Sequence, residues 1–160
     1  MAYNGSMIEK QIAKILTKKN LTLAVAESCT GGIISHSLTN IAGSSKYFLL
    51  GVVAYSNEAK IKVLKLAPEI IRDHGAVSKE TAMELARNIR HLAQANIGLG
   101  VTGIAGPTGA MPCKPVGTVF IAVSIGHNVY FKKFNFRGNR LKIKELAKDA
   151  ALGLLKECLS

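Results

Sequence analysis

The sequence has few cysteines, few acidic residues and no long apolar run, and each shortage excludes a class of protein. Its three cysteines, Cys29, Cys113 and Cys158, are odd in number and include no Cys-x-x-Cys pair, so neither a disulfide framework nor a zinc site is indicated. No apolar stretch approaches the roughly 20 residues that span a bilayer, and the N-terminus lacks the apolar segment of a secretory signal. We therefore expect a cytoplasmic protein with reduced thiols, no metal, no cofactor and no membrane contact.

Acidic residues are half as frequent as basic ones, with 10 Asp and Glu against 21 Lys and Arg, a net charge of +11. Such a charge attracts anions, which include nucleic acids and phosphorylated small molecules, and it does not choose between them. Nucleic-acid binding remains the weaker alternative, because the basic residues near the C-terminus also fit a solvated strand and helix. These residues are Lys132, Lys133, Arg137, Arg140, Lys142 and Lys144.

The length and composition are typical of one compact domain. The chain has 160 residues, of which 48% are hydrophobic and 19% charged, a balance that fits a folded core and excludes intrinsic disorder. The first six residues, ending in Gly-Ser before Met7, resemble an artificial leader. We therefore predict a single domain over residues 7–160, preceded by a leader at residues 1–6.

The pattern of apolar residues predicts an α/β fold. Strands are predicted at 21–26, 47–56, 96–102, 117–125 and 128–136, the second of them apolar enough for a central strand. Helices are predicted at 8–19, 30–39 and 78–93, at the C-terminus after Asn139, and in short segments beginning at Asn57 and Pro68. Alternating strands and helices indicate a three-layer α/β/α domain, and the predicted hairpin about residues 126–127 makes its sheet mixed, although mostly parallel.

A serine lies where the first predicted strand ends and the next helix begins. In Ala-Glu-Ser-Cys-Thr-Gly-Gly (26–32), Ser28 is placed near backbone N–H groups that can stabilise an oxyanion. The two glycines permit close approach of a ligand, and Thr30 is a candidate helix cap. A simple capped helix with glycines for packing explains the same residues equally well.

Ser28 requires a base, because a serine hydroxyl is a weak nucleophile at neutral pH. None of the four histidines has neighbours that suggest a Ser-His-Asp triad. Tyr55 and Lys60 follow the second predicted strand and could reach the same sheet edge, where a desolvated lysine would accept the proton; a solvated helix surface is the commoner place for a lysine. Cys29 is an alternative nucleophile at the helix N-terminus, or a small buried hydrophobe.

A glycine-rich loop follows the third predicted strand. The stretch Gly-Val-Thr-Gly-Ile-Ala-Gly-Pro-Thr-Gly (100–109) lies where α/β sheets commonly bind ligands. Its spacing differs from the dinucleotide-binding fingerprint, and the lack of a Gly-Lys-Ser/Thr step excludes a P-loop. By itself the loop is weak evidence for ligand contact.

Four motifs taken in order carry a family resemblance. The segments 26–32, Gly-Val-Val-Ala-Tyr-Ser-Asn-Glu-Ala-Lys (51–60), Gly-Val-Thr-Gly-Ile-Ala-Gly-Pro (100–107) and Lys-Pro-Val-Gly-Thr (114–118) closely resemble the CinA C-terminal family. That family is known to deamidate nicotinamide mononucleotide to nicotinic acid mononucleotide with release of ammonia. The resemblance therefore implies an amidohydrolase acting on a pyridine nucleotide, and it suggests a homo-oligomer.

The resemblance also implies roles for individual residues. Ser28 becomes the nucleophile, Lys60 its base and Tyr55 a neighbour of both, while Arg140 is expected to bind the phosphate in bidentate geometry. Further substrate contacts are expected from Cys29, Thr30, Gly31, Thr102, Gly103 and Gly106. Asn139 and Ala110 depart from the family pattern, which usually has Asp and often Gly there. These departures leave open an alternative, a catalytically silent nucleotide-binding module of the same fold.

Overall fold

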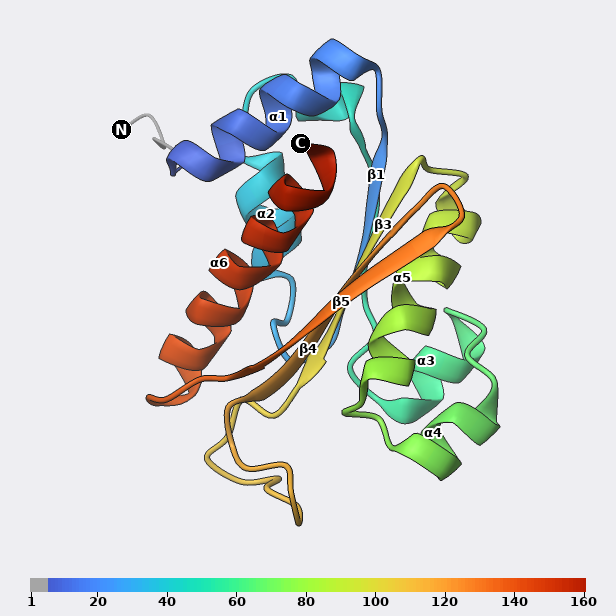
Figure 1. Cartoon of the computed structure of the whole chain (residues 1–160), viewed down its shortest axis with the longest axis vertical. Coiled ribbons are helices and arrows are strands. Elements are labelled where there is room, and N and C mark those ends of the chain that lie inside the picture. Colours follow the sequence, from blue (N-terminus) through green and yellow to red (C-terminus); the bar gives the residue numbers. More distant parts are fainter. Residues whose placement is uncertain (1–5) are drawn as a thin grey trace.

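The computed structural model describes residues 6–160 of the chain, so the predicted leader lies outside the described residues except for Ser6. One five-stranded sheet separates two layers of helices (Figure 1). The predicted three-layer α/β/α architecture is therefore confirmed. None of the helices in the described part of the chain is long and apolar enough to cross a membrane.

The sheet is mixed, with strands in the order β2-β1-β3-β4-β5. Its strands are β1 (Leu23–Glu27), β2 (Phe48–Val53), β3 (Ile97–Gly103), β4 (Thr118–Ile125) and β5 (Asn128–Asn135). β1 is parallel to β2 and β3, whereas β4 is antiparallel to both β3 and β5. β5 consequently points in the same direction as the first three strands, and four carboxyl ends meet at one edge of the sheet.

Each face of the sheet has its own layer of helices (Figure 1). One layer holds α1 (Met7–Lys19), α2 (Ile33–Thr39) and α6 (Arg140–Leu159), and the other holds α3 (Asn57–Lys62), α4 (Pro68–His74) and α5 (Lys79–Ala93). A short 3₁₀ helix, η1 (Ser44–Lys46), precedes β2. The predicted ends of two helices are confirmed: Asn20 closes α1 in a left-handed conformation, and Ser78 caps α5 by accepting from the Thr81 N–H.

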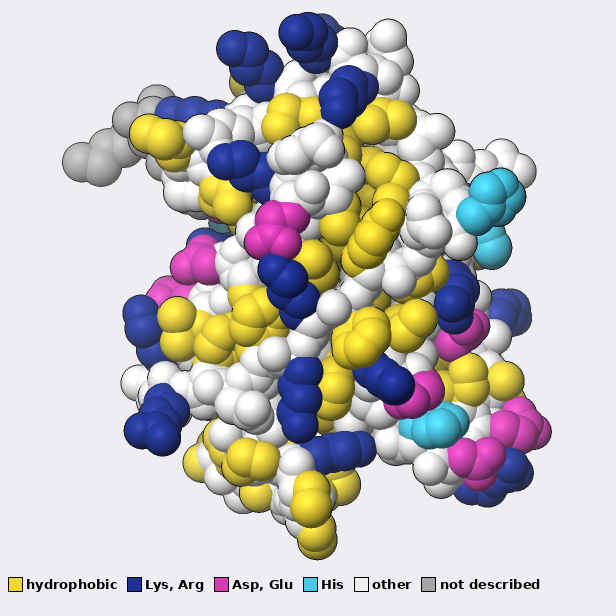
Figure 2. Space-filling model, viewed as in Figure 1, with side chains coloured by type: hydrophobic (Ala, Val, Ile, Leu, Met, Phe, Trp, Pro, Cys, Tyr) yellow, Lys and Arg dark blue, Asp and Glu magenta, His cyan; other side chains and the backbone are white. Residues whose placement is uncertain are grey.

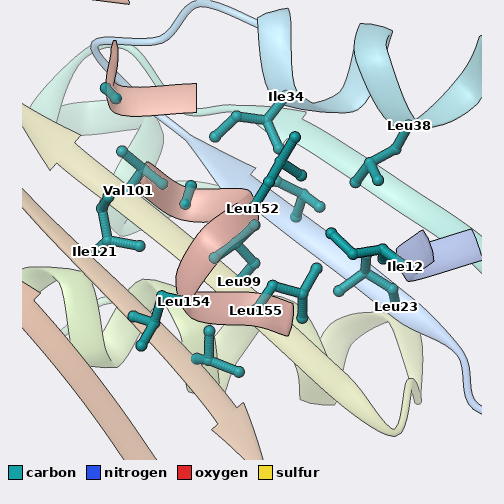
Figure 3. Close-up of a cluster of buried hydrophobic side chains, with 14 of the residues drawn as sticks. Ile12, Leu23, Ile34, Leu38, Leu99, Val101, Ile121, Leu152, Leu154 and Leu155 are labelled. Atoms are coloured by element: carbon teal, nitrogen blue, oxygen red, sulfur yellow. The ribbon is translucent and has the colours of Figure 1, made fainter. Parts of the chain in front are cut away.

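The core is divided by the sheet according to the two-residue period of a strand. Leu23 and Val25 of β1 pack into the larger cluster, beneath α1, α2 and α6 (Figure 3). Ala24 and Ala26 point to the opposite face and join the cluster beneath α3 and α5. Because β1 is buried on both faces, its carboxyl end is a firm support for the residues that follow.

Two glycines let α5 lie close against β3. A Cβ atom at Gly98 would come within 2.0 Å of the Ala86 carbonyl oxygen, and one at Gly100 within 2.6 Å of the Ala82 carbonyl oxygen. Any larger residue would therefore push the helix away from the sheet. Gly98 and Gly100 are therefore packing residues. Gly100 begins the predicted glycine-rich stretch (100–109), whose later part forms the loop after β3.

Two predictions about this framework are wrong. The strand predicted at 47–56 is not central: β2 ends at Val53 and lies at the sheet edge, with Leu49 and Val53 47% and 48% exposed. β1 pairs with β2 on one side and with β3 on the other, so β2 is left at the edge. The apolar pattern of a single strand does not show which strands will lie beside it. The apolar spacing of α5 also predicts one shared face for Ala82, Leu85, Ala86, Ile89 and Leu92. The first four are buried, but Leu92 is 52% exposed because it lies at the end of the helix.

Candidate active site

The candidate catalytic residues gather at the carboxyl edge of the sheet. Ser28 directly follows β1, and Lys60 lies in α3 after β2. Gly103 ends β3 and leads into the glycine loop, and Arg140 opens α6 after β5. Since these four strands share a direction, their following segments meet at the same edge, the usual ligand site of such sheets.

Ser28 and Lys60 form a buried hydrogen-bonded pair. The Lys60 Nζ lies 3.0 Å from the Ser28 Oγ, although 32 positions separate the residues in sequence. Lys60 is 2% exposed and Ser28 7% exposed. The Lys60 Nζ also donates to the Tyr55 carbonyl oxygen at 3.4 Å. A nucleophile and an amine within hydrogen-bond distance are the minimum geometry for serine activation.

Burial shifts the pKa values of the two titratable side chains beside Ser28, Lys60 and Cys29. Removal from water lowers the pKa of Lys60, because desolvation disfavours the ammonium form. Burial likewise raises the pKa of the Cys29 thiol to about 12. Lys60 is thus biased toward the neutral amine that a base requires, whereas Cys29 stays a protonated thiol. This geometry favours Ser28 over Cys29 as the nucleophile.

Glu27 holds the turn that carries Ser28, a role that we did not predict. Its Oε1 accepts from the Ser35 N–H at 2.8 Å and the Ser35 hydroxyl at 2.7 Å. Its Oε2 accepts from the N–H groups of Gly32 at 3.0 Å and Ile34 at 3.2 Å. The buried carboxylate therefore satisfies the free N–H groups of α2. The sequence signal that could have revealed this role is an acidic residue placed between a predicted strand and a pair of glycines.

Thr30 does not cap α2, contrary to the prediction. The helix begins only at Ile33, because Gly31 and Gly32 continue the turn with φ values of 63° and 100°. Thr30 is fully buried, and its Oγ1 has no hydrogen-bond partner within the described residues. The cap that the sequence suggested for Thr30 is made by the carboxylate of Glu27.

A cavity of about 250 Å³ opens beside the Ser28–Lys60 pair. Eight of the ten predicted site residues line it: Ser28, Cys29, Tyr55, Lys60, Thr102, Gly103, Gly106 and Arg140. Thr30 and Gly31 are outside this lining, although the Gly31 N–H donates to the Ser28 carbonyl oxygen at 3.0 Å. Seven further residues line the cavity without having been named as site residues: Asn57, Ala76, Val77, Ile104, Ala105, Thr108 and Gly109. The fold therefore brings most of the predicted site together.

Thr102 has a structural partner in this cavity wall. Its hydroxyl donates to the Ala76 carbonyl oxygen at 2.6 Å, and the residue is 1% exposed. The contact ties the end of β3 to the segment before α5. Thr102 thus fixes the position of the glycine loop, in addition to lining the cavity.

Arg140 bridges two walls of the cavity. One guanidinium nitrogen donates to the Gly106 carbonyl oxygen at 2.6 Å, and the other to the Tyr55 hydroxyl at 2.5 Å. Arg140 begins α6, whose N-cap is Asn139: the Asn139 Oδ1 accepts from the Lys142 N–H at 2.9 Å. An asparagine caps a helix as well as an aspartate does, so this departure from the family pattern preserves the cap.

The described residues provide no obvious place for a metal ion. Across residues 6–160, no group of three or more His, Cys, Asp and Glu side chains is arranged to hold one. The polar side chains that line the cavity include the Ser28 hydroxyl, the Lys60 amine and the Arg140 guanidinium.

Comparison with known proteins gives one consistent likeness. The family model described as the CinA C-terminal domain matches residues 5–159. A CinA-like protein of Syntrophus aciditrophicus is 46% identical over 160 residues, covering 99% of this chain and 38% of that protein. The chain thus spans about 38% of the length of the first curated relatives that it matches.

Solved structures share the whole fold. The competence or damage-inducible protein of Enterobacter asburiae is 35% identical, with a TM-score of 0.92 over 96% of each chain. The competence/damage inducible protein CihA of Agrobacterium tumefaciens is 36% identical, with a TM-score of 0.91 over 98% of each chain. At these identities and TM-scores, the likeness covers the sequence as well as the arrangement of the elements.

Proposed function

Because the chain belongs to the CinA C-terminal domain family, we propose that it hydrolyses the carboxamide of nicotinamide mononucleotide to nicotinic acid mononucleotide and ammonia. The family resemblance supports the choice of substrate. The chemistry depends on one observation, the 3.0 Å contact between the Lys60 Nζ and the Ser28 Oγ inside a cavity.

The first half of the reaction transfers the acyl group to serine. The neutral Lys60 amine takes the Ser28 proton while the Ser28 Oγ attacks the carboxamide carbon. Backbone N–H groups near Ser28 would stabilise the oxyanion that forms. The Lys60 ammonium then transfers this proton to the departing nitrogen, and the C–N bond breaks. Ammonia is released, and the acyl group remains on Ser28 as an ester.

The second half regenerates the serine. Lys60, again neutral, removes a proton from a water molecule, whose oxygen attacks the ester carbon. The bond to Ser28 breaks, the Ser28 oxygen regains the proton, and the nicotinic acid product leaves as a carboxylate. One lysine thus serves as base and acid in both halves, and the two reacting side chains, Ser28 and Lys60, both line the cavity.

Arg140 is suited to bind the phosphate of the substrate. Its guanidinium lies at the cavity wall between Gly106 and Tyr55, and guanidinium groups match phosphate in bidentate geometry. Tyr55 is 58% exposed, so its hydroxyl can follow the guanidinium when the phosphate enters. This arrangement would place the carboxamide deeper, beside Ser28.

The test is the release of ammonia and nicotinic acid mononucleotide from nicotinamide mononucleotide, in the presence of a chelator. We expect product from the wild type and a loss of about 10⁴-fold or more for Ser28→Ala and Lys60→Met. The matched control is Lys62→Met, since Lys62 lies in the same helix but pairs with Glu58 on the surface. Activity equal to wild type in Ser28→Ala would overturn the mechanism.

A different outcome would support the silent-module alternative. If the folded wild type binds nicotinamide mononucleotide in calorimetry but releases no ammonia, the chain is a nucleotide-binding module. From the family resemblance we also propose that the chain forms a homo-oligomer in the cytoplasm, without a nucleic-acid partner. Sedimentation velocity on the purified protein measures the oligomeric state directly.

A further inference from the structure

A second cavity, of about 540 Å³, lies between α1 and η1. Its volume is within the range of small-molecule sites, roughly 300–1,000 Å³. The cavity lies near Tyr47 at the amino end of β2, whereas Ser28 follows the carboxyl end of the parallel strand β1. A strand of this length separates the two edges by about 17–20 Å, so this groove is distinct from the Ser28 cavity.

Four lysines surround this groove: Lys10, Lys14, Lys18 and Lys46. No Asp or Glu lines the groove in the part of the chain that the structure describes. The only acidic residue of α1, Glu9, is fully buried. The floor is apolar, with Ala13 and Ile41 among its residues. Lysine side chains gather at the end of the molecule where α1 lies (Figure 2). The groove therefore has a strongly positive potential.

The spacing of the lysines in α1 does not stabilise that helix. Lys10, Lys14 and Lys18 follow one another at intervals of four residues, where like charges destabilise a helix by about 0.2–0.5 kcal/mol per pair. Two other helical cations do have acidic partners at such intervals, Lys62 with Glu58 and Arg87 with Glu84. Within residues 6–160, Lys14, Lys18 and Lys46 form no ion pair. A bound anion would relieve this repulsion.

We propose that the groove between α1 and η1 binds an elongated small anion carrying two or more phosphate groups. Four residues of an α-helix rise about 6 Å, so the three lysines of α1 extend along about 12 Å. A row of this length can accompany successive phosphates, while Lys46 contributes from the opposite wall. The aliphatic stems of the lysines and the apolar floor exclude water from one side of the anion.

The experiment is calorimetric titration of the full chain with inorganic tripolyphosphate at low salt. The wild type should bind it at a saturable site, with affinity that falls as salt is added. Lys14→Gln/Lys18→Gln should bind about tenfold more weakly or worse. The matched control, Lys79→Gln/Lys132→Gln, removes the same charge from exposed sites and should bind within about twofold of wild type. Glutamine has a helix propensity close to that of lysine, so Lys14→Gln/Lys18→Gln should fold; the control replaces exposed side chains, whose substitution usually changes stability little.

Three results would overturn the proposal. Equal weakening in the control variant would mean that the anion responds only to net charge. Loss of tripolyphosphate binding in Arg140→Gln, with Lys14→Gln/Lys18→Gln unaffected, would place the anion in the Ser28 cavity. Binding of a single-stranded oligonucleotide that depends on Lys14 and Lys18, without any binding of tripolyphosphate, would assign the groove to nucleic acid.

Discussion

Arg140 and Tyr55, 85 positions apart in sequence, meet across 2.5 Å at the mouth of the Ser28 cavity. The contact joins the start of α6 to the segment between β2 and α3. Arg140 also donates to the Gly106 carbonyl oxygen, so one side chain connects segments that follow three different strands. A phosphate bound here would hold those segments in place around the carboxamide.

Arg140→Lys should weaken substrate binding more than catalysis. A lysine keeps the charge but cannot make the two parallel hydrogen bonds, so KM for nicotinamide mononucleotide should rise about 10-fold or more while kcat changes little. Nicotinamide riboside, which lacks the phosphate, should be affected much less. The control is Arg137→Lys, three positions earlier. An equal loss with both substrates would show that Arg140 does not bind the phosphate.

The rate should increase with pH as Lys60 loses its proton. Burial lowers the pKa of Lys60 from the ordinary value of 10.5, so the basic form becomes available below that pH. We expect kcat/KM to rise tenfold per pH unit on the acidic side and to level off at the pKa of Lys60. A pH–rate profile from pH 5 to 10 measures this; a rate independent of pH would contradict the role of Lys60 as the base.

Lys60→Met should remove activity without destabilising the fold. Methionine is similar in length to the lysine side chain and has no amine to desolvate, so the free energy of unfolding should change by less than about 1.5 kcal/mol. Because the folded pKa lies below the unfolded value of 10.5, the unfolded wild type binds more protons between these two values. Wild-type stability therefore rises with pH in that window. Urea unfolding should show this rise in the wild type and not in the variant.

Cys29 should be unreactive and dispensable. Burial raises the pKa of its thiol to about 12, so at pH 8 iodoacetamide should modify the exposed Cys113 long before Cys29. Mass spectrometry of peptides gives the order of modification. Cys29→Ala should keep activity within about threefold of wild type. A large loss of activity in this variant, with Ser28→Ala still active, would make the thiol the nucleophile.

Glu27→Gln should both destabilise the protein and slow the reaction. The carboxylate accepts from three backbone N–H groups and the Ser35 hydroxyl, whereas a glutamine presents an NH₂ group toward some of those donors. We expect a loss of about 2–4 kcal/mol in the free energy of unfolding. The surface variant Glu145→Gln should unfold like wild type.

The kinetic effect of Glu27→Gln separates positioning from base chemistry. If Glu27 acts only by placing Ser28, kcat should fall while the pH midpoint set by Lys60 stays constant. A shift of that midpoint would show instead that the Glu27 charge tunes Lys60 directly.

Much of the fold could be predicted from local patterns. The amphipathic spacing in α1, the cap at Ser78 and the hairpin between β4 and β5 depend on residues close together in sequence. Strands that alternate with helices are predicted to be parallel, so their carboxyl ends lie at the same edge of the sheet. This predicted that Ser28, Lys60 and the glycine loop, which follow three such strands, would lie in one region. The family resemblance depended on four motifs occurring in order, since no single motif was specific. That resemblance in turn indicated Lys60 as the base of Ser28.

Other features depended on contacts between distant residues. Apolarity could not tell that β2 is an edge strand, because strand order is set by which side of β1 each later strand packs against. Thr30 has the residue type of a helix cap, but Gly31 and Gly32 continue the turn, so α2 begins only at Ile33. The carboxylate of Glu27 accepts the hydrogen bonds from the N–H groups at the start of α2.

The amino-acid sequence by itself determined which residues could do the chemistry and roughly where each would lie, because side-chain type and local periodicity are properties of neighbouring residues. Only the tertiary structure decided that Lys60 is 2% exposed and 3.0 Å from Ser28. Burial lowers the pKa of this lysine, and the fold places its amine within hydrogen-bond distance of the serine. Both arise because the fold brings α3 and the end of β1 together at one edge of the sheet, which no local pattern specifies.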